Sequence, residues 1–190
     1  MPPPSLQAPA AVAMVRPHHF RPNPETAADN AFQRPATAAS VAAQAHAEVT
    51  QAAVRLEAAG VRVHLFDSHD PATPDAVFPN NWFSTHAGGH VALYPMYAAN
   101  RRRERRGDII EMLKAQYRVQ DVIDYSGLEH DGMALEGTGA MVLDHIGRIA
   151  YTAQSHRADP VALERFCTHF NFEPMAFATA DAQGRPCYHT

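Results

Sequence analysis

Two adjacent amides stand where the sequence otherwise favours an extended strand. The stretch DAVFPNNWF begins at Asp75 and places Asn80, Asn81 and Trp82 directly after Pro79. Proline cannot donate a hydrogen bond to a neighbouring strand, so Pro79 marks a strand edge, a bulge or a strand end. Each amide offers an acceptor and two donors to a small polar ligand. The stretch therefore predicts either a polar binding site that includes Asp75, or an ordinary polar turn beside a buried tryptophan.

A second candidate is the acid in the segment LEGTG. Glu136 precedes two glycines, which allow the backbone to turn sharply or to approach another segment closely. A carboxylate placed there could grip a ligand, although the local sequence by itself favours a surface acid beside a bulge. The run NRRRERR, residues 100–106, is typical of a solvated helix start. Arg101 or Arg102, if turned inward, could instead hold a substrate carboxylate in a two-pronged contact.

The cysteines and histidines give weaker signals. Cys187 and His189 are two residues apart, and in a strand they would share a face as nucleophile and base, although this spacing makes a short contact hard to form. Cys167 falls on the inward side of a predicted helix. The twelve histidines show no recognised zinc spacing, although His86 and His90 flank a glycine turn and could meet across a hairpin. We expect most histidines to be surface or capping residues, and no metal or organic cofactor is called for.

A recurring order of strand, helix and strand would position these residues. Each copy has ββαβ character and is about 50 to 60 residues long. We expect a disordered lead over residues 1–10, followed by copies at about 11–70, 71–126 and 127–180, and the start of a fourth at 185–190. The clearest local signals are an apolar helix face over residues 38–59, strands over 76–86, 90–96 and 133–144, a helix over 102–117, and a helix capped by Asp159 with Pro160 in its first turn.

Five segments together resemble the pentein superfamily of guanidine- and ureido-modifying enzymes. They are MVRPHHFRPNPETAADNAFQ, DAVFPNNWFSTH, LYPMYAANRRRERR, LEGTGAMVLD and YHT, and they are spread over nearly the whole chain. The resemblance is strongest to the arginine-deiminase-related branch associated with citrulline utilisation. It implies an α+β propeller of five ββαβ units around a pseudo-fivefold axis, of which about three and a fraction are present here.

The resemblance also implies a chemistry and roles for individual residues. A cysteine thiolate attacks the central carbon of the guanidino or ureido group, and a histidine protonates the departing amine and activates the hydrolytic water. By motif position, the catalytic histidine is His189 and the catalytic glutamate is Glu136. The substrate-gripping positions fall on Asp75, Asn80 and Asn81, and the arginine that reads the substrate carboxylate falls on Arg101 or Arg102.

Amides at positions where relatives carry acids suggest a neutral substrate. A guanidinium has only donors and favours carboxylates, whereas a ureido group carries a carbonyl that needs a donor. Asn80 and Asn81 therefore favour a citrulline-like substrate. An arginine-like one stays open, because succinylarginine dihydrolases use a neutral amide near this place.

The chain departs from this family at its end. The nucleophilic cysteine of the family lies about a hundred residues beyond the catalytic histidine, whereas the sequence stops one residue after His189. We therefore expect a hydrolase whose given chain is an incomplete fragment without its nucleophile. The alternatives are an amidinotransferase, which would pass the amidino group to an amine, and a non-catalytic remnant that only binds ligand.

Composition limits the classes of partner and the locations that the protein could have. A net charge of −4 and a pI near 6.3 disfavour a nucleic-acid-binding protein. No apolar stretch reaches the roughly 20 residues that cross a bilayer, and the N-terminus lacks a signal-peptide pattern. Two cysteines without paired spacing fit a reducing compartment such as the cytoplasm. We expect a small amino-acid substrate as the partner, and a homo-oligomer is left open.

Overall fold

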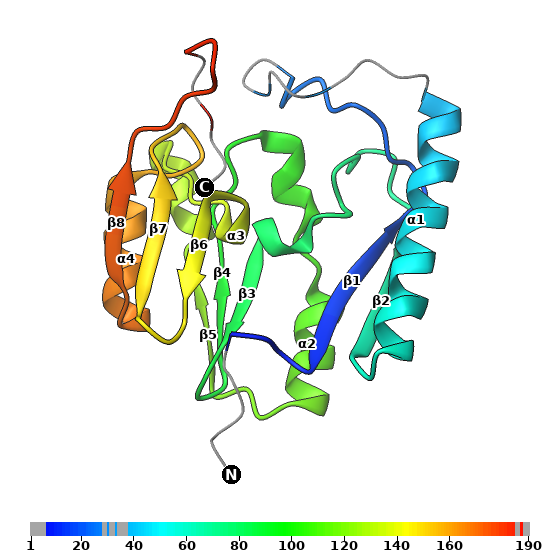
Figure 1. Cartoon of the computed structure of the whole chain (residues 1–190), viewed down its shortest axis with the longest axis horizontal. Helices are drawn as coiled ribbons and strands as arrows, with labels where there is room; N and C mark the ends of the chain where they lie inside the picture. Colours follow the sequence, from blue (N-terminus) through cyan, green and yellow to red (C-terminus); the bar gives the residue numbers. More distant parts are fainter. Residues whose placement is uncertain (1–6, 28–29, 31–32, 34–37, 185–186, 188–190) are drawn as a thin grey trace. The chain divides into compact units, whose positions relative to one another are not determined.

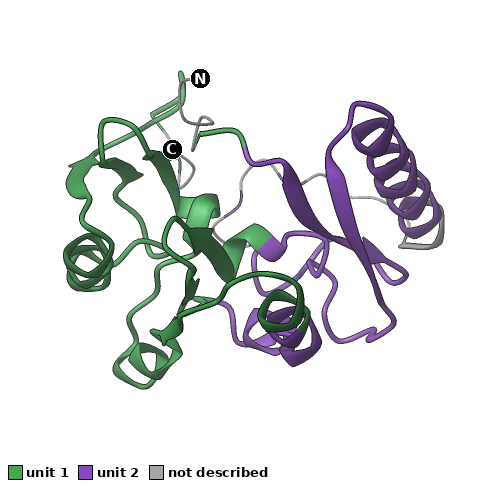
Figure 2. Ribbon diagram, turned by 90° about the horizontal axis from the view of Figure 1, so that it is seen from below, with its two compact units in different colours: residues 1–8, 80–97, 112–190 green, residues 9–79, 98–111 purple. Residues whose placement is uncertain are grey.

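The structure of the protein is a computed structural model that describes residues 7–27, 30, 33, 38–184 and 187. Within these residues the strands form three small sheets, accompanied by α-helices and short 3-10 helices (Figure 1). The α+β class predicted from the sequence is confirmed. Contacts divide the chain into two compact units, coloured separately in Figure 2: unit 1 comprises residues 1–8, 80–97 and 112–190, and unit 2 comprises residues 9–79 and 98–111.

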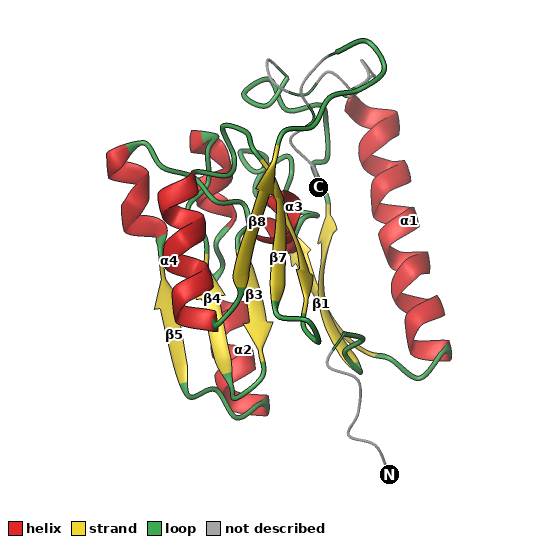
Figure 3. Cartoon of the chain, turned by 60° about the vertical axis from the view of Figure 1, so that its left-hand side comes forward, coloured by secondary structure: helices red, strands yellow, loops and turns green. Residues whose placement is uncertain are grey.

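Unit 2 contains a parallel strand pair crossed by one long helix. Strand β1 (Ala11–Pro17) leads through a loop to helix α1 (Ala38–Ala58), and strand β2 (Arg62–Ser68) returns beside β1. Parallel neighbours need such a crossover, and α1 packs on both strands (Figure 3). Gly60 ends the turn after α1 at a φ of +86°, in the left-handed region that glycine adopts readily. This copy is βαβ among the described residues, rather than the full ββαβ unit expected.

Unit 1 contains two sheets of identical topology. In the first, β3 (Phe83–His86) pairs antiparallel with β4 (His90–Leu93), which pairs parallel with β5 (Asp121–Asp124). In the second, β6 (Met141–Asp144), β7 (Ile149–Ala153) and β8 (Glu173–Phe177) repeat this order. The helices between the last two strands of each sheet are α2 (Gly107–Gln116), which crosses the boundary between the units in the sequence, and α4 (Pro160–Phe170). The ββαβ order predicted for the second and third copies is therefore present.

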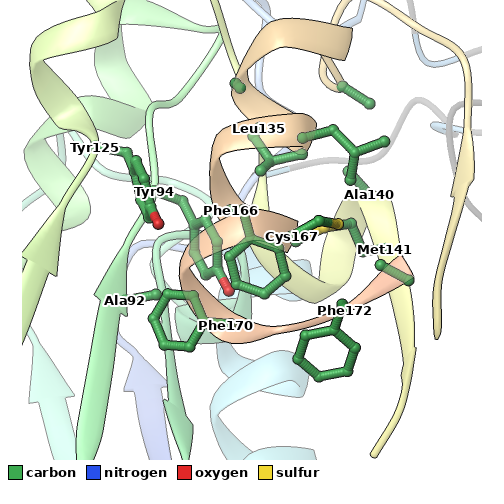
Figure 4. Close-up of a cluster of buried hydrophobic side chains, with 14 of the residues drawn as sticks. Ala92, Tyr94, Tyr125, Leu135, Ala140, Met141, Phe166, Cys167, Phe170 and Phe172 are labelled. Atoms are coloured by element: carbon green, nitrogen blue, oxygen red, sulfur yellow. The ribbon is translucent and has the colours of Figure 1, made fainter. Parts of the chain in front are cut away.

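Helix α4 follows the sequence signals closely. The Asp159 side chain accepts hydrogen bonds from the backbone N–H groups of Val161 and Ala162, as an N-cap does. Phe166 and Phe170 are buried on its inner face, where they pack with Phe172 and Tyr94 in the apolar core of unit 1 (Figure 4).

Four predicted element boundaries are wrong. The strand expected over 90–96 ends at Leu93. The strand expected over 76–86 begins only at Phe83, because residues Pro79–Asn81 form a 3-10 helix, η1. The helix expected over 102–117 is interrupted: Ala99–Glu104 form a separate 3-10 helix, η2, before α2 begins. The strand expected over 133–144 begins only at Met141, because Gly137–Ala140 form a short helix, α3. The predicted fourth copy at 185–190 lies outside the described residues except for Cys187, as do residues 1–6 of the predicted lead.

Candidate functional site

Glu136 is a buried, oriented carboxylate in unit 1. Only 1% of the residue is exposed, which contradicts the surface acid that local sequence favoured. Its Oε2 lies 3.0 Å from Nη1 of Arg157, which is itself buried, and its Oε1 accepts a hydrogen bond of 3.1 Å from the backbone N–H of Tyr97. The backbone N–H of Glu136 donates to the carbonyl of Arg157 at 3.0 Å. Side chain and main chain are thus fixed against the same arginine, so the carboxylate has one orientation.

The two glycines after Glu136 let another segment of unit 1 approach helix α3. A Cβ on Gly137 would lie 2.3 Å from the carbonyl oxygen of Asn80, and the residue has a φ of +45°. A Cβ on Gly139 would lie 2.6 Å from Oδ1 of Asn81. Real Cβ atoms are not found so close to other heavy atoms, and only glycine fits at both places. The segment LEGTG therefore brings the Asn81 amide against the short helix that begins after Glu136.

The two amides of η1 have different surroundings. Asn81 is 8% exposed, whereas the neighbouring Asn80 is an exposed residue. Trp82, which follows them, is buried and packs on Phe83 with ring centroids 4.5 Å apart. The polar turn and the buried tryptophan expected from the sequence are both present. Of the predicted site residues in unit 1, the structure brings Asn81 and the helix of Glu136 together.

In unit 2, Asp75 and Arg101 belong to a network of buried and half-buried polar side chains. Asp75 Oδ2 lies 3.8 Å from Nε of Arg101. The Arg101 guanidinium makes a two-pronged contact with Glu104, with Nε–Oε1 at 3.1 Å and Nη2–Oε2 at 3.0 Å. Both side chains of that pair are at least 97% buried. Arg101 is therefore the inward-turned arginine, but its guanidinium binds Glu104 of the same 3-10 helix. Arg102 is half-buried.

Asn23 is a polar residue of this network that sequence reasoning missed. It is 1% exposed, and its Nδ2 donates to Oδ2 of Asp75 at 2.7 Å. Its side-chain amide also exchanges hydrogen bonds of 2.8 and 3.2 Å with the amide of Asn100. The signal available was its position in the segment RPNPET, within one of the stretches that carry the resemblance. A single asparagine before a proline is typical of a turn, so the local sequence does not predict that Asn23 is buried.

Cys167 lacks the surroundings of an activated nucleophile. Cys167 is buried in α4, and this burial, together with the nearby charge of Glu164, raises the pKa of its thiol to about 11. A thiol with so high a pKa carries almost no thiolate at neutral pH. Cys187 is half-buried, and its backbone N–H donates to the carbonyl of Thr179 at 3.3 Å. His189 lies outside the described residues, so the pairing of Cys187 with His189 stays a prediction.

His86 and His90 face each other in the register of β3 and β4 but make different contacts. The His86 Nε2 lies 2.6 Å from Oγ of Ser84, and its ring packs 4.2 Å from that of Phe170. The His90 Nδ1 lies 2.6 Å from Oδ1 of Asp121. Burial lowers the pKa of His86 to about 3, with smaller contributions from His145, Arg148 and His90 itself. His86 is thus a largely buried imidazole that is neutral at physiological pH.

No helix within the described part of the chain is long and apolar enough to cross a membrane.

Three solved structures with similar folds are remote from this chain in sequence. The N-terminal domain of ArgZ, an arginine dihydrolase from cyanobacteria, matches with a TM-score of 0.64 at 16% identity, covering 93% of this chain and 60% of that domain. A dimethylarginine dimethylaminohydrolase adduct with S-methyl-L-thiocitrulline matches with a TM-score of 0.61 at 15% identity, covering 90% of this chain and 63% of the other. AgrE, in complex with ornithine and NAD+, matches with a TM-score of 0.65 at 18% identity, covering 94% of this chain and 24% of the other. At such identities the likeness establishes the fold, and this chain spans less than two thirds of each of these relatives.

Sequence comparison identifies the family. No curated protein matches the chain significantly. The family described as N,N dimethylarginine dimethylhydrolase, eukaryotic, matches residues 16–190, which is nearly the whole chain. Together with the shared fold, this match means that the chain belongs to the N,N dimethylarginine dimethylhydrolase family, within the pentein superfamily of guanidino-modifying enzymes.

Proposed function

We propose that this chain belongs to a hydrolase that cleaves C–N bonds at the guanidino or ureido end of an arginine-related amino acid. The family match supports the reaction class. The structural observation that carries the proposal is the Glu136 carboxylate, which is buried in unit 1 and held in one orientation by Arg157 and the Tyr97 backbone. Each carboxylate oxygen has two acceptor sites, so a carboxylate oriented by Arg157 and Tyr97 can also accept a hydrogen bond from a substrate nitrogen.

The amides of η1 favour a neutral group as the ligand. The Arg157 guanidinium balances the charge of Glu136, and Asn80 and Asn81 add none. A site with so little net negative charge suits a neutral ureido group, whose carbonyl can accept from an amide N–H. Two relatives of similar fold are named for arginine and dimethylarginine, which favours a guanidino group instead. We keep both citrulline-like and arginine-like substrates within the proposal, to be separated by direct comparison.

The covalent step follows from the resemblance. A cysteine thiolate would attack the central carbon, and His189 would protonate the leaving amine and activate water. Cys167 is unsuited to this role because of its burial and raised pKa, so a nucleophile within this sequence would have to be Cys187. By the resemblance, we further propose Asp75 as a substrate-gripping residue and Arg101 or Arg102 as the arginine that binds the substrate carboxylate.

The test measures binding and turnover separately. The purified chain is incubated with arginine, N,N-dimethylarginine and citrulline while ammonia, methylamines and ornithine are quantified, and calorimetry measures the affinity for each ligand. Glu136→Gln should abolish release and weaken ligand binding at least tenfold. Glu173→Gln, which removes an exposed acid of β8, is the matched control and should change neither.

Each alternative predicts a distinct result. Binding without product would support a non-catalytic ligand-binding chain, and amidino transfer to added glycine would indicate a transferase. Release that persists in Cys187→Ala would exclude Cys187 as the nucleophile. Equal behaviour of Glu136→Gln and Glu173→Gln would contradict the role of Glu136.

We also propose a cytoplasmic location, because the sequence has only two cysteines and no paired spacing of a disulfide framework. Fractionation of the native cells would test it.

A further inference from the structure

Three side chains of unit 2 that are far apart in the sequence converge on one place. They are His18 after β1, His46 in the middle of α1, and Asp67 near the end of β2. One potential ligand atom from each residue lies within 4.8 Å of those of the other two. The His18 Nε2 lies 2.8 Å from Oδ1 of Asp67, and the rings of His18 and His46 meet edge to face with centroids 4.7 Å apart.

Arg16 holds the carboxylate of this cluster in place. Its Nε lies 2.7 Å from Oδ1 of Asp67 and its Nη2 lies 2.9 Å from Oδ2. Hydrogen bonds from Arg16 and from His18 thus converge on the Asp67 carboxylate. A bidentate arginine also fixes its plane, as outer partners of metal ligands commonly do.

We propose that His18, His46 and Asp67 bind a divalent transition-metal ion, with Zn²⁺ as the ion that their chemistry fits best. Two imidazole nitrogens and one carboxylate oxygen are ordinary zinc ligands, at about 2.0 to 2.2 Å from the ion. Ligand atoms around a tetrahedral ion at those distances are roughly 3.3 Å apart. The His18–Asp67 pair at 2.8 Å would therefore open by about 0.5 Å, and the atoms that now lie up to 4.8 Å apart would close to that distance. A bound ion would replace the hydrogen bond that now joins His18 and Asp67.

The fourth position is available to water or to a neighbouring imidazole. His69 is exposed, and its ring centroid lies 4.1 Å from that of His18. Three protein ligands with an open fourth position can also exchange their ion more easily than a closed set of four. The ligands come from the loop after β1, from α1 and from β2, so a bound ion ties the helix to both strands. This site is independent of the proposed hydrolase reaction.

Zinc binding and thermal unfolding test the proposal on the tag-free chain. Titration with Zn²⁺ should give one site per chain, and the melting temperature should rise by roughly 5 °C at a hundredfold excess over Kd. Co²⁺ used as a probe should develop visible absorption of the intensity expected for a four-coordinate ion. His46→Gln should lower the Zn²⁺ affinity at least tenfold and remove most of the thermal shift.

A matched variant separates this site from adventitious binding to the other histidines. His19→Gln removes an exposed histidine next to His18 and should keep the affinity and the thermal shift. Circular dichroism without metal checks that both variants fold, and His18→Gln provides a second ligand deletion if His46→Gln does not. Equal Zn²⁺ affinity in wild type and His46→Gln, equal weakening in His19→Gln, or the absence of any Zn²⁺ binding would overturn the proposal.

Discussion

Replacing Gly139 by alanine tests how the Asn81 amide is positioned. The added Cβ would lie 2.6 to 2.8 Å from three atoms of the Asn81 amide group. Asn81 is 8% exposed and its side chain is short, so the amide can move away only by disturbing its surroundings. Overpacking of this kind costs about 1 to 3 kcal/mol. Alanine in place of glycine within a helix returns up to about 1 kcal/mol, so we expect Gly139→Ala to reduce the free energy of unfolding by about 1 to 2 kcal/mol.

A double-mutant cycle identifies the cause of that loss. In an Asn81→Ala background the obstructing amide is absent, so Gly139→Ala should become neutral or stabilising by up to about 1 kcal/mol. The coupling between the two positions should therefore be on the order of 1 to 3 kcal/mol. Gly127→Ala is the matched control, because a Cβ at Gly127 meets nothing within 4 Å, and it should be neutral within about 0.5 kcal/mol.

Urea unfolding followed by circular dichroism gives all four free energies of the cycle. Ligand affinity measured on the same variants shows whether the amide also serves binding. A destabilisation of Gly139→Ala that is equal in both backgrounds would refute the contact between Gly139 and Asn81 as its origin. The loss would then belong to the backbone of α3 itself.

Three further predictions concern protonation, buried charge and substrate binding. The folded pKa of His86 is about 3 and its ordinary value is 6.5, so the unfolded chain binds more protons between those values and stability falls as the pH falls through that range. This proton binding lowers the free energy of unfolding by about 2 kcal/mol between pH 6.5 and pH 5. Urea midpoints at both pH values should therefore depend less on pH in His86→Gln than in wild type, with the exposed His130→Gln as control. Parallel pH profiles of wild type and His86→Gln would contradict this. Arg101→Ala deprives the buried Glu104 of its guanidinium fork and should destabilise by roughly 3 kcal/mol. Arg102→Ala should instead weaken substrate binding with little loss of stability, and the reverse pattern in thermal melts and calorimetry would reassign the two arginines.

Local signals in the sequence were sufficient for much of the fold. The cap at Asp159, the apolar face of α4 and the repeated strand order all depend on neighbours a few residues away. The PNN turn and the short helix after Glu136 were misassigned as strands because their conformation depends on each other. The backbone carbonyl of Asn80 lies against Gly137, and the side-chain amide of Asn81 lies against Gly139, although these residues are more than fifty positions apart in the chain.

The candidate site residues also owe their burial to contacts that local sequence does not reveal. The burial of Glu136 follows from its contact with Arg157, and the burial of Asn23 follows from contacts with Asp75 and Asn100. Neither contact has a spacing that a linear reading could detect. The pairing of Arg101 with Glu104 is different, because an i,i+3 pair of opposite charge is a recognisable pattern. The expectation of a regular α-helix through this run, with a solvated start, concealed its inward orientation.

The parallel pairing of β1 with β2 has a consequence for the order of folding. Ala11 pairs with Arg62, so the two strands can meet only after the whole intervening loop and α1 have been closed. The β3–β4 hairpin, in contrast, closes through a turn of three residues between His86 and His90. Hairpins form in about 1 to 10 μs, whereas contacts between distant parts of the chain form more slowly because the entropy of loop closure opposes them. The β1–β2 pair should therefore be among the last elements to acquire protection from hydrogen exchange during refolding.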